Sequence, residues 1–373
     1  MSKVHITLVG GQPAPVYHGI VATKPDKVVY IYSQNSYKVL QALINEITIP
    51  SEQIKLDETS PIKIMRCAEK LADKYKDDEV TVNISSGLKS WSHWFGVVFD
   101  KYTNAAVVYM DQNNVLWNYK TMESTTDFEF DMHTLFRLYG NSLKNNFTPF
   151  TDYTEDDFKV MAEVEQMRNL NVSVFNKLTT VLSKERANMV RNAKSGVINE
   201  GESYVEWNRG ESSVQLGVMK GSKLHTRSLS SPNIMNIVFN AGWFELKVAK
   251  LLSQWSHAKE ICLNCRFPFK KGVDKNEVDI LINTGVKILF VECKTQITTT
   301  TDIDKFRSVI KEYGGIGSKG LFITDAVMTD ISKEKCNERK IVSFSLQDNH
   351  LGLDTEKALF WLLDSELYNI NVK

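Results

Sequence analysis

Residues 276–282 read NEVDILI and residues 290–294 read FVECK, and these two stretches decide the fold of the second half of the chain. Both are apolar runs rich in branched residues, interrupted by acidic residues or lysine, which is typical of strands. Thr284 and Gly285 lie between them and favour a turn. We therefore expect the two stretches to form an antiparallel hairpin.

The acidic residues of this hairpin occupy positions that can share a metal ion. Glu292 and Lys294 are two residues apart, so their side chains leave the same face of the strand. With a two-residue turn, Asp279 lies opposite Phe290 and diagonal to Glu292, while Glu277 faces Glu292 directly. Carboxylate oxygens favour Mg²⁺ or Mn²⁺, and such an ion beside a lysine suits phosphodiester hydrolysis. The same spacing also fits a solvated sheet edge with a Glu–Lys pair.

The order of these residues resembles the PD-(D/E)xK nuclease superfamily. Asp279 is followed after twelve residues by Glu292, and Lys294 completes the Glu-x-Lys element at the end of an apolar strand. Val278 precedes Asp279, where many members of the superfamily have proline. Members often place a further acidic residue on a preceding helix, and Glu245 in the stretch GWFEL occupies that place. The resemblance implies that Glu245, Asp279 and Glu292 hold Mn²⁺ or Mg²⁺ and that Lys294 assists the attacking water.

The first half of the chain alternates between strand-like and helical patterns. The strand-like runs are residues 4–9, 28–32, 80–84 and 105–110, with a further strand at 115–119 that is expected to form a hairpin with the fourth. Strands that alternate with helices predict a mostly parallel, doubly wound sheet. Such sheets bind ligands beyond the carboxyl ends of their strands.

Polar and glycine-rich loops follow three of these strands. The residues that we expect to contact a ligand there are Gly10, Gly11, Gln12, Ser33, Ser85, Ser86, Gly87 and Lys89. Small residues let the backbone approach a phosphate, whose charge a helix N-terminus and Lys89 can offset. Each loop alone is more often a plain turn. Together, on one sheet edge, they indicate a nucleotide site.

The composition becomes polar around residues 141–153, so we place the domain boundary between residues 148 and 149. Residues 1–148 form the sensing domain, and residues 149–373 form a helical connector and a nuclease domain. Within the second part, the patterns predict a long helical stretch over 156–193, interrupted by asparagines, and an antiparallel hairpin of 204–207 with 213–219. A further continuous helix is predicted over 233–255.

The whole arrangement resembles the CARF-domain nucleases of type III CRISPR systems, the Card/Can group. Residues 85–89 (SSGLK) correspond loosely to that family's Ser/Thr-Gly-x-Lys-type signature. The resemblance implies an α/β protein with an N-terminal Rossmann-like CARF domain and a C-terminal restriction-endonuclease-like domain. It also implies a homodimer that binds a cyclic oligoadenylate, foremost cyclic tetra-adenylate, and is thereby activated allosterically. The substrate would be single-stranded or nicked DNA, RNA or both, cleaved in antiviral defence.

Composition sets the remaining expectations. The chain has 373 residues, which favours two domains, and 45 basic residues balance 45 acidic ones, so nucleic-acid binding requires a local basic surface. Five scattered cysteines indicate a reducing compartment. Cys262 and Cys265 have metal-ligand spacing but no second pair, so we expect buried thiols there. An N-terminus without a signal-peptide pattern, and no apolar run of roughly 20 residues, predict a cytoplasmic protein without a membrane segment.

Two other functions remain open from the sequence. The chain could be a constitutive restriction or repair nuclease whose N-terminal sheet is a scaffold, and it would then cleave without an activator. It could also be a nucleotide-sensing regulator whose second domain only binds partners. In that case Asp279→Ala and Lys294→Ala would leave its function intact.

Overall fold

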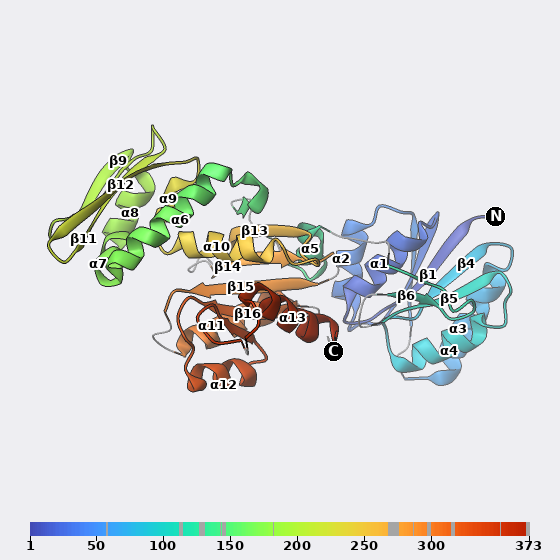
Figure 1. Cartoon of the computed structure of the whole chain (residues 1–373). Coiled ribbons are helices and arrows are strands. Elements are labelled where there is room, and N and C mark those ends of the chain that lie inside the picture. The colour runs from blue at the N-terminus through green and yellow to red at the C-terminus, as the bar shows by residue number, and fades with distance from the viewer. Residues whose placement is uncertain are drawn as a thin grey trace. The chain divides into compact units, whose positions relative to one another are not determined.

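A computed structural model describes most of the chain, which divides into two compact units (Figure 1). The first unit contains residues 1–143 and 313–317, and the second contains residues 144–312 and 318–373. The residues outside the described part are 57–58, 112–114, 127–130, 142, 144–146, 182, 268–275, 286, 297–299, 315–317, 351 and 371–373. Among the described residues, no helix combines the length and apolar character needed to cross a membrane.

The first unit is built on a seven-stranded sheet with the order β3-β2-β1-β4-β5-β6-β7. Its strands are β1 (Lys3–Val9), β2 (Lys27–Tyr32), β3 (Ser51–Lys55), β4 (Glu79–Asn83), β5 (Ala105–Met110), β6 (Leu116–Asn118) and β7 (Ser124–Thr125). Strands β1 to β5 run parallel and β6 returns antiparallel beside β5. The doubly wound sheet and the hairpin after its fourth predicted strand are thus confirmed, whereas β3, with its alternating and half-exposed residues, escaped the sequence analysis.

Helices cover both faces of this sheet (Figure 1). They are α1 (Pro13–Thr23), α2 (Tyr37–Glu46), α3 (Pro61–Lys74), α4 (Lys89–Phe99) and α5 (Met132–Leu138). Helices α3 and α4 pack with Ile6 and Leu8 of β1 on one face. On the other face, α1, α2 and the end of α5 pack against Val9 of β1 and the alternate residues of β2.

The face of β1 that α1 covers also carries buried polar side chains. His5 and Thr7 are fully buried there, and His5 Nδ1 lies 2.8 Å from Thr23 Oγ1 at the end of α1. Burial lowers the pKa of His5 to about 3, because the apolar surroundings disfavour the charged imidazolium. His5 is therefore a neutral core residue of this unit.

The second unit begins with separate helices over the stretch where a helical pattern interrupted by asparagines was predicted. They are α6 (Glu155–Leu170), α7 (Val172–Thr179) and α8 (Lys184–Asn192), preceded by β8 (Thr148–Pro149) and a short 3₁₀ turn at Phe150–Asp152. The pattern is interrupted at Asn171, which adopts an extended conformation and whose side chain accepts a hydrogen bond from Val174 N, so that a new helix starts there. Ser183 caps α8 in the same way.

A four-stranded antiparallel sheet follows, with the order β12-β11-β10-β9. Its strands are β9 (Ser195–Glu200), β10 (Ser203–Asn208), β11 (Ser213–Lys220) and β12 (Lys223–Ser230). The predicted hairpin of β10 and β11 is confirmed, with Tyr204 opposite Gly217. The inner face of this sheet, which includes Val205, Trp207 and Leu216, joins the same hydrophobic core as α6 and α7.

The largest sheet of the second unit has the order β17-β16-β15-β14-β13-β8. The strands are β13 (Glu260–Phe267), β14 (Asn276–Asn283), β15 (Ile288–Lys294), β16 (Ser318–Thr324) and β17 (Val342–Ser345). Strands β15, β16 and β17 run parallel, while β13, β14 and β15 form an antiparallel meander. Cys262 and Cys265 lie in β13 as buried thiols, and burial raises the pKa of Cys262 to about 12, in agreement with the sequence prediction.

Helices cover both faces of the six-stranded sheet as well. The remaining helices are α9 (Ile234–Val238), α10 (Gly242–Leu252), α11 (Thr301–Tyr313), α12 (Asp330–Glu338) and α13 (Thr355–Tyr368). Helices α10 and α13 share a core with Leu321 and Ile323 of β16. Phe322, between these two residues, points to the opposite face, where it contacts Phe306 of α11. Both units are therefore layered α/β structures, as predicted.

The predicted continuous helix over 233–255 is also interrupted. Asn240 and Ala241 have positive φ angles of 54° and 64°, which end α9 and turn the chain into α10. Gly242 follows, and a Cβ at this position would clash with the carbonyl oxygen of Asn236. This tight turn sets the direction in which α10 presents Glu245.

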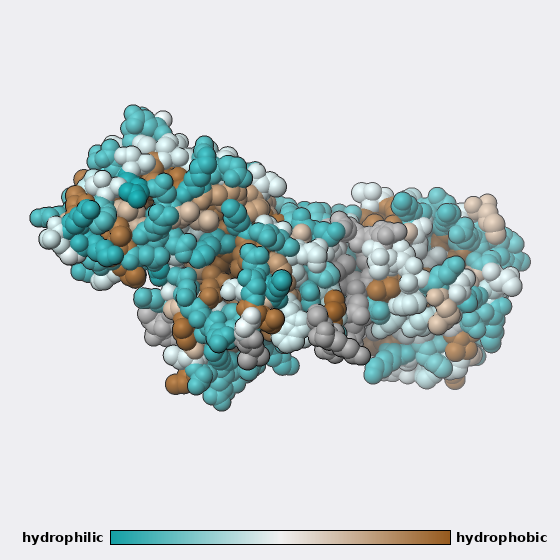
Figure 2. Space-filling view, viewed as in Figure 1, coloured by the Kyte–Doolittle hydropathy of each residue, from teal (hydrophilic) through white to brown (hydrophobic). Residues whose placement is uncertain are grey.

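Over the face of the molecule shown in Figure 2, hydrophilic residues predominate and hydrophobic ones form small, scattered groups.

Candidate active site and ligand-binding loops

The register of β14 and β15 brings Asp279 and Glu292 closer than the sequence predicted. Leu281 pairs with Phe290 and Ile280 pairs with Val291. The next position in this register places Asp279 directly beside Glu292, where the expected partner was Phe290. The prediction was wrong by two residues because the connection spans residues 284–287, closed by hydrogen bonds between Thr284 and Lys287, and is not a two-residue turn.

Glu277 does not face Glu292 in this register, although its negative charge helps to raise the pKa values of Glu245 and Asp279. It pairs with Arg266 of β13, and Arg266 Nε lies 3.2 Å from Glu277 Oε2 in an ion pair. Glu277 is exposed. The predicted position of Glu277 opposite Glu292 is therefore corrected.

Two close contacts hold the side chains of the site. Cys293 N donates a hydrogen bond of 2.7 Å to Asp279 Oδ2, which ties the carboxylate to the neighbouring strand. Lys294 Nζ donates a hydrogen bond of 2.5 Å to Glu292 Oε1. Cys293 itself points to the other face and joins the hydrophobic core, as predicted. Asp279, Glu292 and Lys294 thus gather at the carboxyl end of β15.

The pKa values of these groups are shifted because several carboxyl groups lie close together and are poorly solvated. Burial raises the pKa of Glu292 to about 7, and the negative charge of Asp279 adds to the shift. Burial and then Asp279 raise the pKa of Glu245 well above its ordinary value, and burial also raises that of Asp279. Burial alone would lower the pKa of Lys294, but Asp279 and Glu292 raise it. Lys294 is therefore a firmly protonated cation among three carboxyl groups.

The residues of this site fit a hard divalent cation. Three carboxyl groups face a single lysine, so the cluster carries more acid groups than local positive charge can neutralise. Oxygen ligands of this kind suit Mg²⁺ or Mn²⁺. Within the described part of the chain, no three acidic, histidine or cysteine side chains are already arranged around a common ion position. One reason is that Asp279 and Glu292 direct oxygens at Cys293 N and Lys294 Nζ.

Sequence reasoning missed an ion pair next to the site. Asp325 follows β16, and its N–H donates a hydrogen bond of 3.0 Å to the carbonyl of Lys294. Arg168 of α6 forms a buried ion pair with Asp325, with Nη1 and Oδ2 3.0 Å apart, and its guanidinium lies 5.1 Å from the Trp243 ring centroid. An acid directly after an apolar strand is a signal that could have found Asp325. Arg168 carries no such signal in the sequence.

In the first unit, the loops after β1 and β4 pack against each other. Gly10 N donates a hydrogen bond of 3.1 Å to Ser86 Oγ, and Ser86 Oγ lies 3.3 Å from the carbonyl oxygen of Gln12. A Cβ on Gly10 would lie only 2.5 Å from Gly87 N, and Gly87 itself has a φ of 80°. The order in which the chain adds strands to the sheet reverses between β1 and β4. In such folds a ligand crevice usually lies at this point.

The hydroxyls of Ser85 and Ser86 mainly shape these loops. Ser85 Oγ donates to Asn83 Oδ1 at 2.5 Å and accepts a hydrogen bond of 2.7 Å from Met110 N. Buried Asn83, which sequence reasoning did not select, also donates to the carbonyl of Pro15. Ser33 is buried, and its N–H donates to Ser36 Oγ.

The other expected ligand residues differ in how they are held. Gly11 has open space around the position of a Cβ. Gln12 Oε1 accepts a hydrogen bond of 3.3 Å from Tyr139, a partner far away in the sequence. Lys89 is exposed at the first residue of α4. Gly11 and Lys89 are therefore the exposed residues of this set, whereas Gln12 and Ser85 are half-buried and Ser33 and Ser86 are buried.

A family model matches the part of the chain that forms this edge of the sheet. Residues 4–137 match the family described as the Card1 CARF domain. The N-terminal unit is a CARF domain. The loops that we expect to bind a ligand contain residues 10–12, 33 and 85–89, and we call them the ligand loops. All of them lie within its matched residues. No curated protein matches the sequence of the chain.

Solved structures share the fold over almost the whole chain. Can2 from Sulfobacillus thermosulfidooxidans in complex with cyclic tetra-adenylate matches with a TM-score of 0.64 and 16% identity, covering 98% of this chain and 99% of that one. Protein VC1899 from Vibrio cholerae matches with a TM-score of 0.70 and 14% identity, covering 98% of each chain. A type III CRISPR defence DNA nuclease activated by cyclic oligoadenylate matches with a TM-score of 0.56 and 13% identity over 94% of this chain, which spans 49% of that structure. The CARF domain is thus followed by a second unit whose fold also occurs in these proteins.

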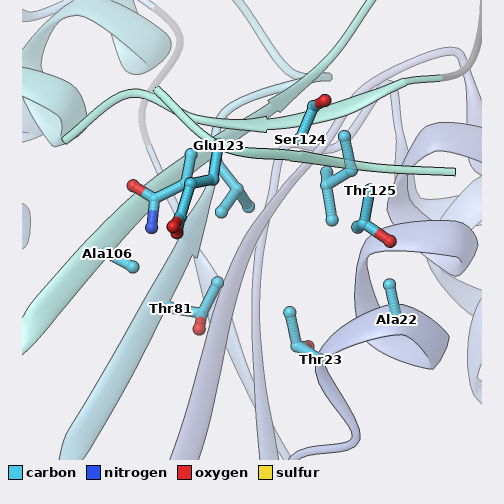
Figure 3. Close-up of a pocket in the computed structure, with 10 residues that line it drawn as sticks. Ala22, Thr23, Thr81, Ala106, Glu123, Ser124 and Thr125 are labelled. Atoms are coloured by element: carbon cyan, nitrogen blue, oxygen red, sulfur yellow. The ribbon is translucent and has the colours of Figure 1, made fainter. Parts of the chain in front are cut away.

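The CARF domain also contains a cavity of about 520 Å³ away from the ligand loops. Its walls come from the end of α1, from β4 and β5, and from the segment that contains β7 (Figure 3). Thr81 and Ala106 line it from the interior of their strands, whereas the ligand loops follow the strands' carboxyl ends. None of the eight residues expected to bind the ligand lines this cavity.

Proposed function

We propose that this chain is a metal-dependent endonuclease that is activated when its CARF domain binds a cyclic oligoadenylate. The observation that carries the proposal is the cluster of Asp279, Glu292 and Lys294 at the carboxyl end of β15, electrostatically coupled to Glu245 of α10. Carboxyl groups with raised pKa values beside a lysine are typical of functional sites. A CARF domain on the same chain supplies a sensor for the activator.

In this proposal each residue of the cluster has a distinct role. Glu245, Asp279 and Glu292 would hold Mg²⁺ or Mn²⁺, which when bound activates a water and neutralises charge on the phosphoryl group. The protonated Lys294 orients that water or stabilises negative charge that develops on a phosphoryl oxygen. The hydrogen bond from Cys293 N holds the Asp279 carboxylate in place. The boundary near residue 148 separates this nuclease domain and its helical connector from the sensor.

The activator is a cyclic oligoadenylate, and we favour cyclic tetra-adenylate because the Can2 structure with the same fold was solved with this ligand. The loops that contain Gly10, Gly11 and Gln12, Ser33, and residues 85–89 bind it through backbone N–H groups, helix N-termini and Lys89. A homodimer offers a two-fold symmetric site for a cyclic ligand. Binding repositions the nuclease domains and permits cleavage of single-stranded or nicked DNA, of RNA, or of both, in antiviral defence.

The test is cleavage of labelled single-stranded DNA, supercoiled DNA and RNA with Mn²⁺, with and without cyclic tetra-adenylate. We expect cleavage only with both metal and activator, and a loss of roughly a hundredfold or more in Glu292→Gln, which keeps the size of the side chain but removes its charge. Glu366→Gln is the matched control, because Glu366 is an exposed partner of Lys319 outside the cluster.

The other outcomes identify the alternatives. Equal cleavage without the activator would show a constitutive nuclease and would demote the CARF domain to a scaffold or to a sensor of another ligand. Absence of cleavage of every substrate would contradict the nuclease and favour a sensing regulator.

A further inference from the structure

A second feature of the nuclease unit lies on the same sheet edge as the carboxylates. Lys294, Thr324 and Ser345 occupy matching positions in the parallel strands β15, β16 and β17. Neighbouring strands are about 4.8 Å apart, so Ser345 lies only about 10 Å from Lys294 along this edge. A cavity of about 410 Å³ opens beyond Ser345.

Aromatic side chains flank this cavity. The His350 ring stacks on Phe344 with ring centroids 4.3 Å apart and an interplanar angle of 5°. A contact of 2.8 Å between His350 Nε2 and the carbonyl of Ser345 holds the ring in this orientation. Trp361 of α13 also lines the cavity and is 46% exposed, although an indole of this size is usually buried.

The loop that carries His350 is preformed. Ser345 Oγ accepts hydrogen bonds from Gln347 N at 3.1 Å and Asp348 N at 3.2 Å. The same hydroxyl donates to the carbonyl of Ala326 at 2.9 Å. A cavity wall held in this way costs little ordering when a ligand binds.

The polar groups of the cavity suit a base better than a phosphate. Among the described residues that line the cavity, the basic ones are Lys333 and His350. Lys333 Nζ lies 2.7 Å from Asp348 Oδ2. That ion pair leaves little positive charge for a phosphate. Asn337 and Asn349 also line the cavity, and their amides can donate and accept hydrogen bonds as a nucleobase edge requires.

The geometry points to a binding site for an unpaired nucleobase of a single-stranded substrate, held beside Trp361 and His350 while the neighbouring phosphate lies at the carboxylates. This inference rests on the proposed nuclease function. A strand that follows the carboxyl ends of β15, β16 and β17 passes both sites. Because the base must leave its stack to enter, the cavity favours single-stranded over duplex nucleic acid.

The test measures binding and not cleavage, in chains that carry Glu292→Gln. The probes are a short labelled single-stranded oligonucleotide and a counterpart of equal length that lacks its bases. We expect the parent, which is the chain with Glu292→Gln alone, to bind the oligonucleotide that has bases roughly tenfold or more tightly than the one that lacks them. The reason is that stacking on an aromatic ring contributes appreciably to the binding free energy per base. Trp361→Ala should remove this difference, and Trp361→Phe should retain most of it.

Ile331→Ala is the matched control, because Ile331 is 71% exposed on α12 and does not line the cavity. It should bind both oligonucleotides as the parent does. Equal binding of the two oligonucleotides by the parent, or unchanged binding in Trp361→Ala, would overturn the inference. A change of sedimentation in Trp361→Ala would also overturn it, since this surface would then join two copies of the chain.

These outcomes separate the two proposals. Base-dependent binding that requires Trp361 supports the cavity even if the unmodified chain cleaves nothing. Metal-dependent cleavage by the unmodified chain together with Trp361-independent binding leaves the nuclease in place and removes the base site.

Discussion

At the scale of single residues, burial decides which groups of this protein carry charge. Glu292 and Asp279 lie side by side in poorly solvated surroundings, so their pKa values rise even though Lys294 lies beside them. His5 shows the opposite consequence, because burial favours its neutral form. Asp279 and Glu292 belong to the candidate cation site, whereas His5 belongs to a core whose surroundings disfavour a cation.

His5 leads to an expectation for acid stability. Its pKa is about 3 in the folded chain, whereas an imidazole in an unfolded chain titrates near 6.5. Below about pH 6.5 the unfolded state therefore binds a proton that the folded state does not, and the free energy of unfolding falls by up to about 1.4 kcal/mol per pH unit. Replacing His5 with Asn should make this fall shallower in denaturation series from about pH 7 to about pH 4.

The control for this measurement is His93→Asn, because His93 is exposed on α4. The fall of the unfolding free energy toward low pH should be shallower in His5→Asn than in His93→Asn. If His5→Asn shows the same acid dependence as the parent, titration of His5 does not contribute to acid unfolding. The buried His18, whose pKa is also about 3, would then be the residue to examine.

At the scale of elements, short connections between neighbouring elements position both sites. The turn at Asn240 and Ala241 directs α10, and through it Glu245, toward the end of β15. In the CARF domain, the loops after β1 and β4 touch through Gly10 and Ser86. Because these loops belong to adjacent strands, their mutual packing determines the shape of the edge that we expect to bind the ligand.

Gly10 and Gly11 form a matched pair for testing that packing. Gly10→Ala places a Cβ 2.5 Å from Gly87 N and 2.8 Å from Ser86 Oγ, whereas Gly11→Ala meets open space. We expect Gly10→Ala to destabilise the domain by about 1–3 kcal/mol and to weaken binding of cyclic tetra-adenylate. Thermal unfolding and calorimetric titration measure the two effects.

Gly11→Ala should change the unfolding free energy by no more than about 0.5 kcal/mol. Equal stability of the two variants would show that the loops after β1 and β4 separate without cost. The proposed role of their contact in shaping the ligand edge would then be wrong.

At the scale of the whole molecule, a CARF domain and the proposed nuclease unit in one chain allow binding and cleavage to be measured separately. A ligand that binds only the folded CARF domain stabilises it by mass action, by about 2.7 kcal/mol at a concentration a hundredfold above its dissociation constant. We expect cyclic tetra-adenylate to raise the melting temperature accordingly, with one molecule bound per two chains in sedimentation and titration experiments. Linear tetra-adenylate is the control and should produce a smaller shift.

Glu292→Gln should show the full shift with cyclic tetra-adenylate, because the substitution lies outside the CARF domain. A missing shift in the unmodified chain would contradict the proposed activator. A shift that disappears in Glu292→Gln would show that the added ligand binds the second unit.

The sequence by itself determined the class of each unit and the residue types of the candidate active site. Strand and helix periodicity are local properties, so the parallel sheet of the CARF domain and the apolar strands that carry Asp279 and Glu292 could be predicted from neighbouring residues. The spacing of Glu292 and Lys294 settled their common face for the same reason. The acid on α10 followed only from the resemblance to a nuclease superfamily.

Only the tertiary structure decided which of these residues meet. The connection at 284–287 set the register that places Asp279 beside Glu292, because a change in loop length moves every cross-strand pair. The break at Ala241 arose from positive φ angles that helical periodicity does not encode, and side-chain capping decided that Asn171 is a point of interruption. Arg168 reached Asp325, and Tyr139 reached Gln12, across 157 and 127 residues of sequence. Such contacts depend on how elements pack, so local patterns could not reveal them.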